Sequence, residues 1–188
     1  MESKTNAMRI LDRHKIDYRS YSYDGSRALS GIEVATALGQ NPKQVFKTLV
    51  TVGKSHQHYV FMIPVAEELD LKKAAAAAGE KSVEMVKSKE LLGLTGYVHG
   101  GCSPLGMKKP FPTFADETAA DFATIIFSAG KIGFQIEAPL AALEEIVGFR
   151  KPRAPAQRVR KPHMETTKKS RVQAGQAKRH GNAPNRIR

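Results

Sequence analysis

The chain has 188 residues, 41% of them hydrophobic, which suits one domain with an appendage or two very small domains. No stretch has membrane-spanning length, no signal-peptide pattern opens the chain, and one cysteine excludes an internal disulfide, so we expect a cytoplasmic protein. The chain has 30 Lys and Arg residues and 18 Asp and Glu residues. Residues 150–188 contain 13 of the basic residues and one of the acids, which leaves 17 basic and 17 acidic residues in 1–149. We therefore predict a neutral domain, 1–149, and a basic tail, 150–188, too poor in apolar residues to fold alone.

The neutral domain is predicted to mix helices and strands without a regular alternation. In chain order we expect a helix (4–14), a strand (18–23), a helix (30–38), a hairpin (45–52 and 59–63), a helix (71–78), a strand (82–85), a turn of helix (88–92), three strands (112–115, 123–128 and 134–136) and a helix (139–147). Helix ends carry clear signals, such as the capping box Ser30 to Glu33. The pattern favours an α+β fold with a mixed, barrel-like β-sheet surrounded by helices.

The stretch 100–106, Gly-Gly-Cys-Ser-Pro-Leu-Gly, is a glycine-rich loop that we expect to leave a strand at Tyr97-Val98. Adjacent glycines permit positive φ angles and close approach of backbone to a ligand, and successive N–H groups can bind an anion or an oxyanion. A tight connection whose exit is set by Pro104 explains the same residues, so both interpretations stay open.

Lys47 is the most suggestive charged residue, because it lies in a strand whose two faces are both largely apolar. Either its ammonium reaches a cavity, where it can meet a phosphate or a developing oxyanion, or its stem packs while its head reaches water. Ser128 can offer a hydroxyl to a ligand or merely end a strand. Asp116 can be a polar site residue or a helix N-cap.

Cys102 lies three residues from His99, which invites the idea of thiol catalysis. We do not favour it, because short spacing along the chain does not establish the geometry that a Cys–His pair needs. The chain has no dinucleotide-binding or phosphate-binding glycine motif, no HExxH sequence and no usual zinc spacing. We therefore expect no cofactor and no catalytic metal.

An ordered set of motifs resembles the YbaK/EbsC family, in particular its bacterial Cys-tRNA(Pro)/Cys-tRNA(Cys) deacylases. The motifs span residues 45–49 (VFKTL), 70–73 (DLKK), 96–106 (GYVHGGCSPLG) and 128–130 (SAG), within a similarity that covers about residues 4–149. The resemblance implies a fold like the editing domain of bacterial prolyl-tRNA synthetases, and hydrolysis of the ester that joins a wrong amino acid to tRNA. Editing of this kind corrects errors between substrates that binding alone cannot separate.

The resemblance also implies site residues. It places the pocket lysine at Lys47, the functional glycine at Gly100 and the pocket serine at Ser128; we add Gly101 and Asp116 as substrate-binding candidates. It implies that the thiol of the substrate cysteine attacks its own ester and leaves as a thiolactone, so that no protein nucleophile is needed. Other members carry an aliphatic residue at the position of Cys102, which speaks further against thiol catalysis.

The expected partners are aminoacyl-tRNA, prolyl-tRNA synthetase and, for the basic tail, RNA phosphates. The tail has no aromatic residue, so it is expected to add electrostatic affinity rather than base stacking. Two alternatives remain at this point. One is a deacylase of another mischarged tRNA such as Ala-tRNA(Pro), and the other is a non-enzymatic RNA-binding protein.

Overall fold

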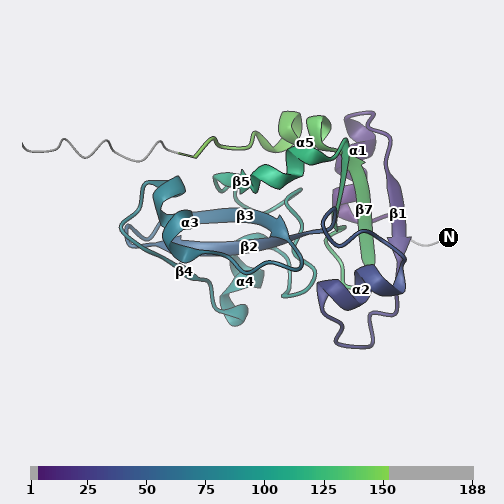
Figure 1. Ribbon diagram of the computed structural model, residues 1–188, viewed down its shortest axis with the longest axis horizontal. Helices are drawn as coiled ribbons and strands as arrows, with labels where there is room; N and C mark the ends of the chain where they lie inside the picture. The colour runs from purple at the N-terminus through teal and green to yellow at the C-terminus, as the bar shows by residue number, and fades with distance from the viewer. Residues whose placement is uncertain (1–3, 153–188) are drawn as a thin grey trace, which may run out of the picture. The chain divides into compact units, whose positions relative to one another are not determined.

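The computed structural model describes residues 4–152, which form two β-sheets with helices around them (Figure 1). The helices are α1 (Asn6–Arg13), α2 (Gly31–Ala37), α3 (Leu71–Ala78), α4 (Ser88–Thr95), the 3₁₀ helix η1 (Glu117–Asp121) and α5 (Leu140–Val147). The strands are β1 (Arg19–Ser22), β2 (Phe46–Gly53), β3 (His58–Pro64), β4 (Val83–Met85), β5 (Thr113–Ala115), β6 (Thr124–Ser128) and β7 (Phe134–Pro139). Within this range, no helix is both long and apolar enough to cross a bilayer.

The two sheets differ in size and in strand direction. One has the order β1-β7-β6 and is antiparallel throughout, whereas the other has the order β4-β2-β3-β5, in which β3 and β5 are parallel. They are joined by an isolated parallel bridge between Val45 and Ile126. This confirms the α+β class and the mixed sheet. The barrel-like part of the prediction is not confirmed, because the strands of residues 4–152 form two separate sheets that do not close into a barrel.

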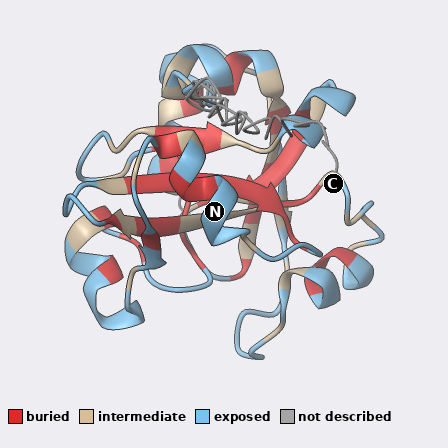
Figure 2. Cartoon of the chain, turned by 60° about the vertical axis from the view of Figure 1, so that its left-hand side comes forward, coloured by how far each residue is buried: buried red, intermediate tan, exposed pale blue. Residues whose placement is uncertain are grey.

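The largest core cluster lies between the three-stranded sheet and the helices α1 and α5. It contains the inward side chains of β6 and β7 together with Leu11, Phe46, Leu105 and Leu143. Figure 2 shows buried residues concentrated along the strands, while the helices keep exposed outer faces. A second cluster packs the alanines of α3 on Phe61 and Phe114 of the other sheet. Small side chains in α3 thus allow a close approach to bulky aromatic rings.

Local signals fix most helix ends where the sequence placed them. Ser30 and Glu33 form the capping box of α2, and Asp70 accepts hydrogen bonds from the backbone N–H groups of Lys72 and Lys73 at the start of α3. Gly79 closes α3 with φ 73°, a left-handed angle that costs glycine little. These caps satisfy helix N–H and C=O groups that would otherwise lack partners.

Two sequence predictions about local structure were wrong. Helix α4 runs to Thr95 rather than to residue 92. Tyr97 and Val98 do not form a strand: Gly96 ends α4 with φ 83°, and the chain passes straight into the glycine loop. Tyr97 is buried against Leu91 and Cys102, so its apolar character reflects packing rather than strand pairing. The predicted tail lies largely outside the described residues.

Candidate active site

The register of β2 and β6 brings Lys47 and Ser128 to neighbouring positions. Val45 and Ile126 form a parallel bridge, and each candidate lies two residues further along its own strand in the same direction. Residues two apart on a strand share a face, so both side chains project to the side on which Val45 and Ile126 pack with Ala35 and Val65. Lys47 and Ser128 therefore lie beside the bridge that joins the two sheets.

Lys47 is partly buried, with 28% of its side chain exposed. Its Nζ lies 3.7 Å from Oε1 of Glu68, whose side chain is 98% exposed. The stem therefore packs on the strand while the ammonium faces an open edge. This geometry matches the expectation of a packed stem with a solvent-reaching head, and it leaves the charge accessible to an anionic ligand.

Gly100 occupies a tight turn of the glycine loop. Gly101 N–H donates to the carbonyl of Val98 over 3.0 Å, and Gly100 has φ 83° at the third turn position, as a type II turn requires. Among residues 4–152, the Gly100 N–H has no recorded acceptor, and the residue is exposed. An exposed backbone donor on a fixed turn is the element needed to stabilise a developing oxyanion.

The glycine loop packs directly on the loop that follows Ser128. A Cβ on Gly101 would lie 3.2 Å from the Ile132 backbone nitrogen, and a Cβ on Gly130 would lie 2.7 Å from the Tyr97 ring. Both glycines are therefore needed for the two loops to approach this closely. Because Tyr97 OH also donates to the Leu105 carbonyl over 2.5 Å, the loop is held at both ends. The packing places the Gly100 turn against the loop that follows Ser128, the last residue of β6.

Ser128 and Asp116 already serve local roles. Ser128 Oγ accepts a hydrogen bond from Gly130 N–H at 3.2 Å, which ends the strand and leaves the hydroxyl proton available. Asp116 caps η1, and its Oδ1 accepts from both the N–H and the hydroxyl of Thr118. The Asp116 backbone extends β5 beside Met62, so β3 separates it from Lys47. The structure places Lys47 and Ser128 at neighbouring positions and the Gly100 turn against the loop after Ser128, whereas Asp116 lies across β3 from Lys47.

Sequence reasoning missed a buried polar group beside Ser128. Gln135, the cross-strand partner of Ser128, is only 7% exposed, and its Oε1 accepts from Gln40 Nε2 at 2.9 Å. Gln40 Oε1 is buried and has no hydrogen-bond partner among residues 4–152. A buried acceptor of this kind is costly unless a ligand or water satisfies it. The only sequence signal was a single amide in the apolar run Phe134-Gln135-Ile136.

The same face of the three-stranded sheet carries further polar groups. Tyr21, the other cross-strand neighbour of Gln135, donates from its hydroxyl to Glu137 at 2.5 Å, and Thr124 donates to the same carboxylate at 2.7 Å. These two hydrogen bonds lower the pKa of Glu137 below its ordinary value. The carboxylate therefore stays ionised and structural, so it is not a general acid at neutral pH.

Cys102 is unsuited to nucleophilic catalysis. Burial raises the pKa of its thiol from 9.0 to about 12, and the side chain packs with Val50, Val60 and Leu91. A thiol with such a pKa is protonated at neutral pH, and the protonated form is a poor nucleophile. His99 is exposed, whereas Cys102 is buried. Within the described residues, no group of three or more His, Cys, Asp or Glu side chains is placed to hold a metal ion.

Comparison with known proteins identifies the family. The family model for the aminoacyl-tRNA editing domain matches residues 28–146, which include Lys47, Gly100 and Ser128. This chain belongs to that family. It is 51% identical over 144 residues to a protein of Enterococcus faecalis named "Putative Cys-tRNA(Pro)/Cys-tRNA(Cys) deacylase EbsC", covering 76% of this chain and 88% of the relative. The resemblance to the YbaK/EbsC family is thereby confirmed.

Two solved structures share the fold. One, described as a "putative trans-editing enzyme for prolyl tRNA synthetase", gives a TM-score of 0.67 at 24% identity over 79% of this chain and 96% of its own. Another, the hypothetical protein APE2540, gives a TM-score of 0.68 at 20% identity over 76% and 93% of the two chains. At these identities the likeness supports the α+β editing-domain fold alone.

Proposed function

We propose that this protein is a trans-editing aminoacyl-tRNA deacylase that removes cysteine from Cys-tRNA(Pro), and also from Cys-tRNA(Cys). The observation that carries the proposal is the placement of Lys47 beside Ser128 and of the Gly100 turn against the loop after Ser128. Membership of the editing family and the name of the 51% identical EbsC support both the reaction and the cysteinyl substrate. The location we propose is the cytoplasm, where charged tRNA is used.

The proposed reaction uses the thiol of the substrate. The cysteine sulfur attacks the ester carbonyl carbon, the carbon–oxygen bond to the terminal ribose breaks, and the thiol proton passes to the ribose oxygen. The products are free tRNA and a cysteine thiolactone, so atoms balance without a cofactor. This route suits a site in which the protein's own thiol, Cys102, is buried with a pKa of about 12.

Each site residue has a distinct proposed role. The Gly100 N–H donates to the carbonyl oxygen as negative charge develops, while Gly101 lets the turn lie close to Ile132. The Lys47 ammonium binds the phosphate of the terminal nucleotide and holds the ester against the turn. Ser128 offers its hydroxyl to the substrate. The assignment of Asp116 to substrate binding stays a prediction, since its Oδ1 is held by Thr118.

Hydrolysis of three substrates tests the proposal. Purified protein is incubated with Cys-tRNA(Pro), Cys-tRNA(Cys) and Ala-tRNA(Pro), and the remaining aminoacyl-tRNA is measured over time. We expect turnover of the cysteinyl esters, and a thiolactone released from them. No hydrolysis of any ester would refute the enzyme, whereas preference for Ala-tRNA(Pro) would move the protein to a related specificity and exclude thiol assistance.

The tail and prolyl-tRNA synthetase are proposed aids to tRNA capture. With 13 basic residues and one acid, residues 150–188 can release counterions from RNA phosphates. This charge is also what favours the rival, a non-enzymatic RNA-binding protein. The rival predicts that deleting the tail removes RNA binding, its only measurable property. A deacylase without the tail is expected to keep its chemistry and to lose affinity for tRNA. Adding prolyl-tRNA synthetase is expected to increase turnover of Cys-tRNA(Pro) at low enzyme concentration.

A further inference from the structure

A hollow of about 320 Å³ lies between the second half of the glycine loop and the end of α5, and we call it the α5 pocket. Its lining residues come from α1, the segment 104–113 and the segment 146–150. None of Lys47, Gly100, Gly101, Asp116, Ser128 and Gln135 lines it. The volume lies at the small end of the range for ligand pockets, which suits a unit of nucleotide size.

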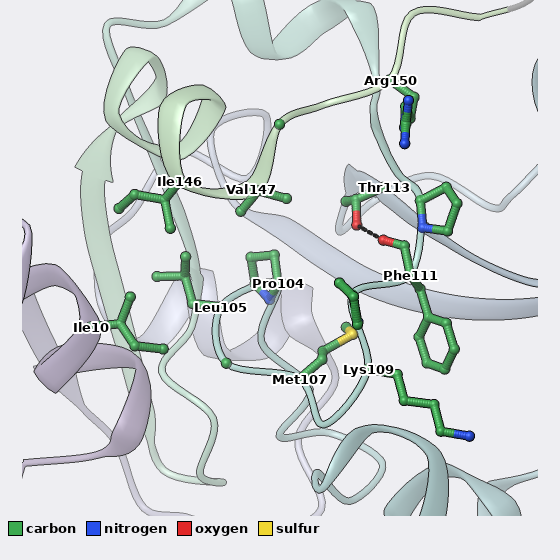
Figure 3. Close-up of a pocket in the computed structure, with 14 residues that line it drawn as sticks. Ile10, Pro104, Leu105, Met107, Lys109, Phe111, Thr113, Ile146, Val147 and Arg150 are labelled. Carbon is green, nitrogen blue, oxygen red and sulfur yellow. Dashed lines mark hydrogen bonds between the residues drawn. The ribbon is translucent and has the colours of Figure 1, made fainter.

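The α5 pocket has an apolar part and a basic part. In the view of Figure 3, Ile10, Leu105 and Ile146 lie on one side, and Lys109 and Arg150 lie on the other with Phe111 and Thr113 between them. The lining contains no acidic residue. The ion pairs recorded for residues 4–152 are Lys4 with Asp12 and Lys47 with Glu68, so neither pocket cation is neutralised by a carboxylate in that range.

Both cations belong to segments with defined neighbours. Arg150 N–H donates to the Thr113 carbonyl at 2.8 Å, which fixes the chain as it leaves α5. Lys109 lies close enough to His58 to lower the pKa of that imidazole, after the larger effect of burial and against a smaller opposing effect of Glu90. The His58 ring in turn packs on Phe111, with 5.2 Å between ring centroids. The basic side is therefore a defined part of the fold.

We infer that the α5 pocket binds a nucleotide of the tRNA outside its acylated end, with the phosphates on Lys109 and Arg150 and the sugar and base over the apolar side. The inference rests on the proposed function, which supplies a polyanionic ligand. Charge selects this occupant: the chain's own tail has a large excess of positive charge and would be repelled by two cations. Arg150 both lines the pocket and begins the basic segment 150–188.

Binding of uncharged tRNA to the full-length chain tests the inference. The variant Lys109→Ala/Arg150→Ala removes both cations and keeps the backbone hydrogen bond of Arg150 to Thr113. Two lost phosphate contacts lower the log–log salt slope by about 1.4 to 1.8, which corresponds to roughly 25- to 60-fold weaker binding at 0.1 M salt if the variant and wild type converge at 1 M. Lys72→Ala/Lys81→Ala removes the same charge in and after α3 and is the matched control.

A second measurement separates the pocket from catalysis. With Cys-tRNA(Pro) the pocket variant is expected to raise KM and keep kcat, whereas with a cysteinylated CCA trinucleotide it behaves as wild type. Met107→Gln, which changes the apolar lining without changing charge, is expected to weaken tRNA binding while the salt slope stays the same. Thermal unfolding shows whether each variant is folded.

Three outcomes overturn the inference. The first is that the pocket variant binds tRNA as tightly as the Lys72→Ala/Lys81→Ala control. The second is that it loses as much activity on the trinucleotide as on full-length tRNA. The third is that it loses affinity only for prolyl-tRNA synthetase, which would make the pocket a protein-docking site. If wild type hydrolyses no ester, the proposed function fails, yet the binding of uncharged tRNA still decides whether the pocket recognises RNA. The two failures are therefore distinguishable.

Discussion

Replacing Lys47 with methionine separates catalysis from stability at the candidate active site. Methionine keeps an unbranched apolar stem on β2 and removes the ammonium. If that ammonium orients the terminal phosphate and aids the transition state, its loss lowers single-turnover hydrolysis of Cys-tRNA(Pro) by about 10²- to 10³-fold, the range for a lost electrostatic group in a catalytic site.

The expected effect of Lys47→Met on stability is small. The ion pair lost is 3.7 Å long, and its partner Glu68 is 98% exposed, so its contribution to the free energy of unfolding is about 0.2–1 kcal/mol. For a chain of this size, that corresponds to a change in Tm of at most about 4 °C. Glu68→Gln is the matched control, because it removes the same ion pair and keeps the Lys47 ammonium.

Two measurements on the same samples decide the matter: rapid-quench hydrolysis of Cys-tRNA(Pro) and thermal unfolding followed by circular dichroism. We expect Lys47→Met to be folded and nearly inactive, and Glu68→Gln to be folded and active. The reasoning is refuted if Lys47→Met keeps more than half of the wild-type rate. It is equally refuted if Glu68→Gln loses as much activity, since the ion pair rather than the free cation would then matter.

Three further predictions concern the thiol, the packing of the two loops and the tail. Cys102→Ala is expected to keep activity. Because the folded-state pKa of Cys102 is raised from 9.0 to about 12, the wild type loses stability relative to this variant as pH rises from about 9 to 12, by about 1.4 kcal/mol at pH 10. Denaturant titrations measure this difference, and parallel stability–pH curves for the two proteins would contradict it. Gly130→Ala places a Cβ 2.7 Å from the Tyr97 ring at φ 88°, so it is expected to lower the free energy of unfolding by more than about 2 kcal/mol. Gly39→Ala, at φ 65° with nothing within 4 Å of the new Cβ, is expected to lower it by about 1 kcal/mol. Equal losses of the two variants in urea unfolding would argue against the loop contact. Deleting residues 153–188, which leaves Arg150 in place, lowers the salt slope of tRNA binding by about 3.5 to 4.5 if five phosphates are contacted, and an unchanged slope would exclude the tail from RNA binding.

The sequence located the elements well, because their signals are local. The capping box at Ser30, the cap at Asp70 and the left-handed glycine at 79 act within a few residues of their own helix ends. Prediction failed at Tyr97 and Val98, where an apolar pair looked like a strand. Burial of Tyr97 beside Leu91 and Cys102 explains that apolar character, and only tertiary packing supplies such neighbours.

The sequence by itself determined the family motifs, the identity of Lys47, Gly100 and Ser128 as candidates, and the separation of charge between domain and tail. Only the tertiary structure decided which candidates meet. The Val45–Ile126 bridge aligns Lys47 with Ser128, whereas β3 separates Asp116 from Lys47. Only the tertiary structure revealed the buried Gln40–Gln135 pair and the α5 pocket, because their residues are distant in the chain. The physical reason is that helix caps and turns are set by local hydrogen bonds, whereas a site depends on strand register and packing between segments far apart in sequence.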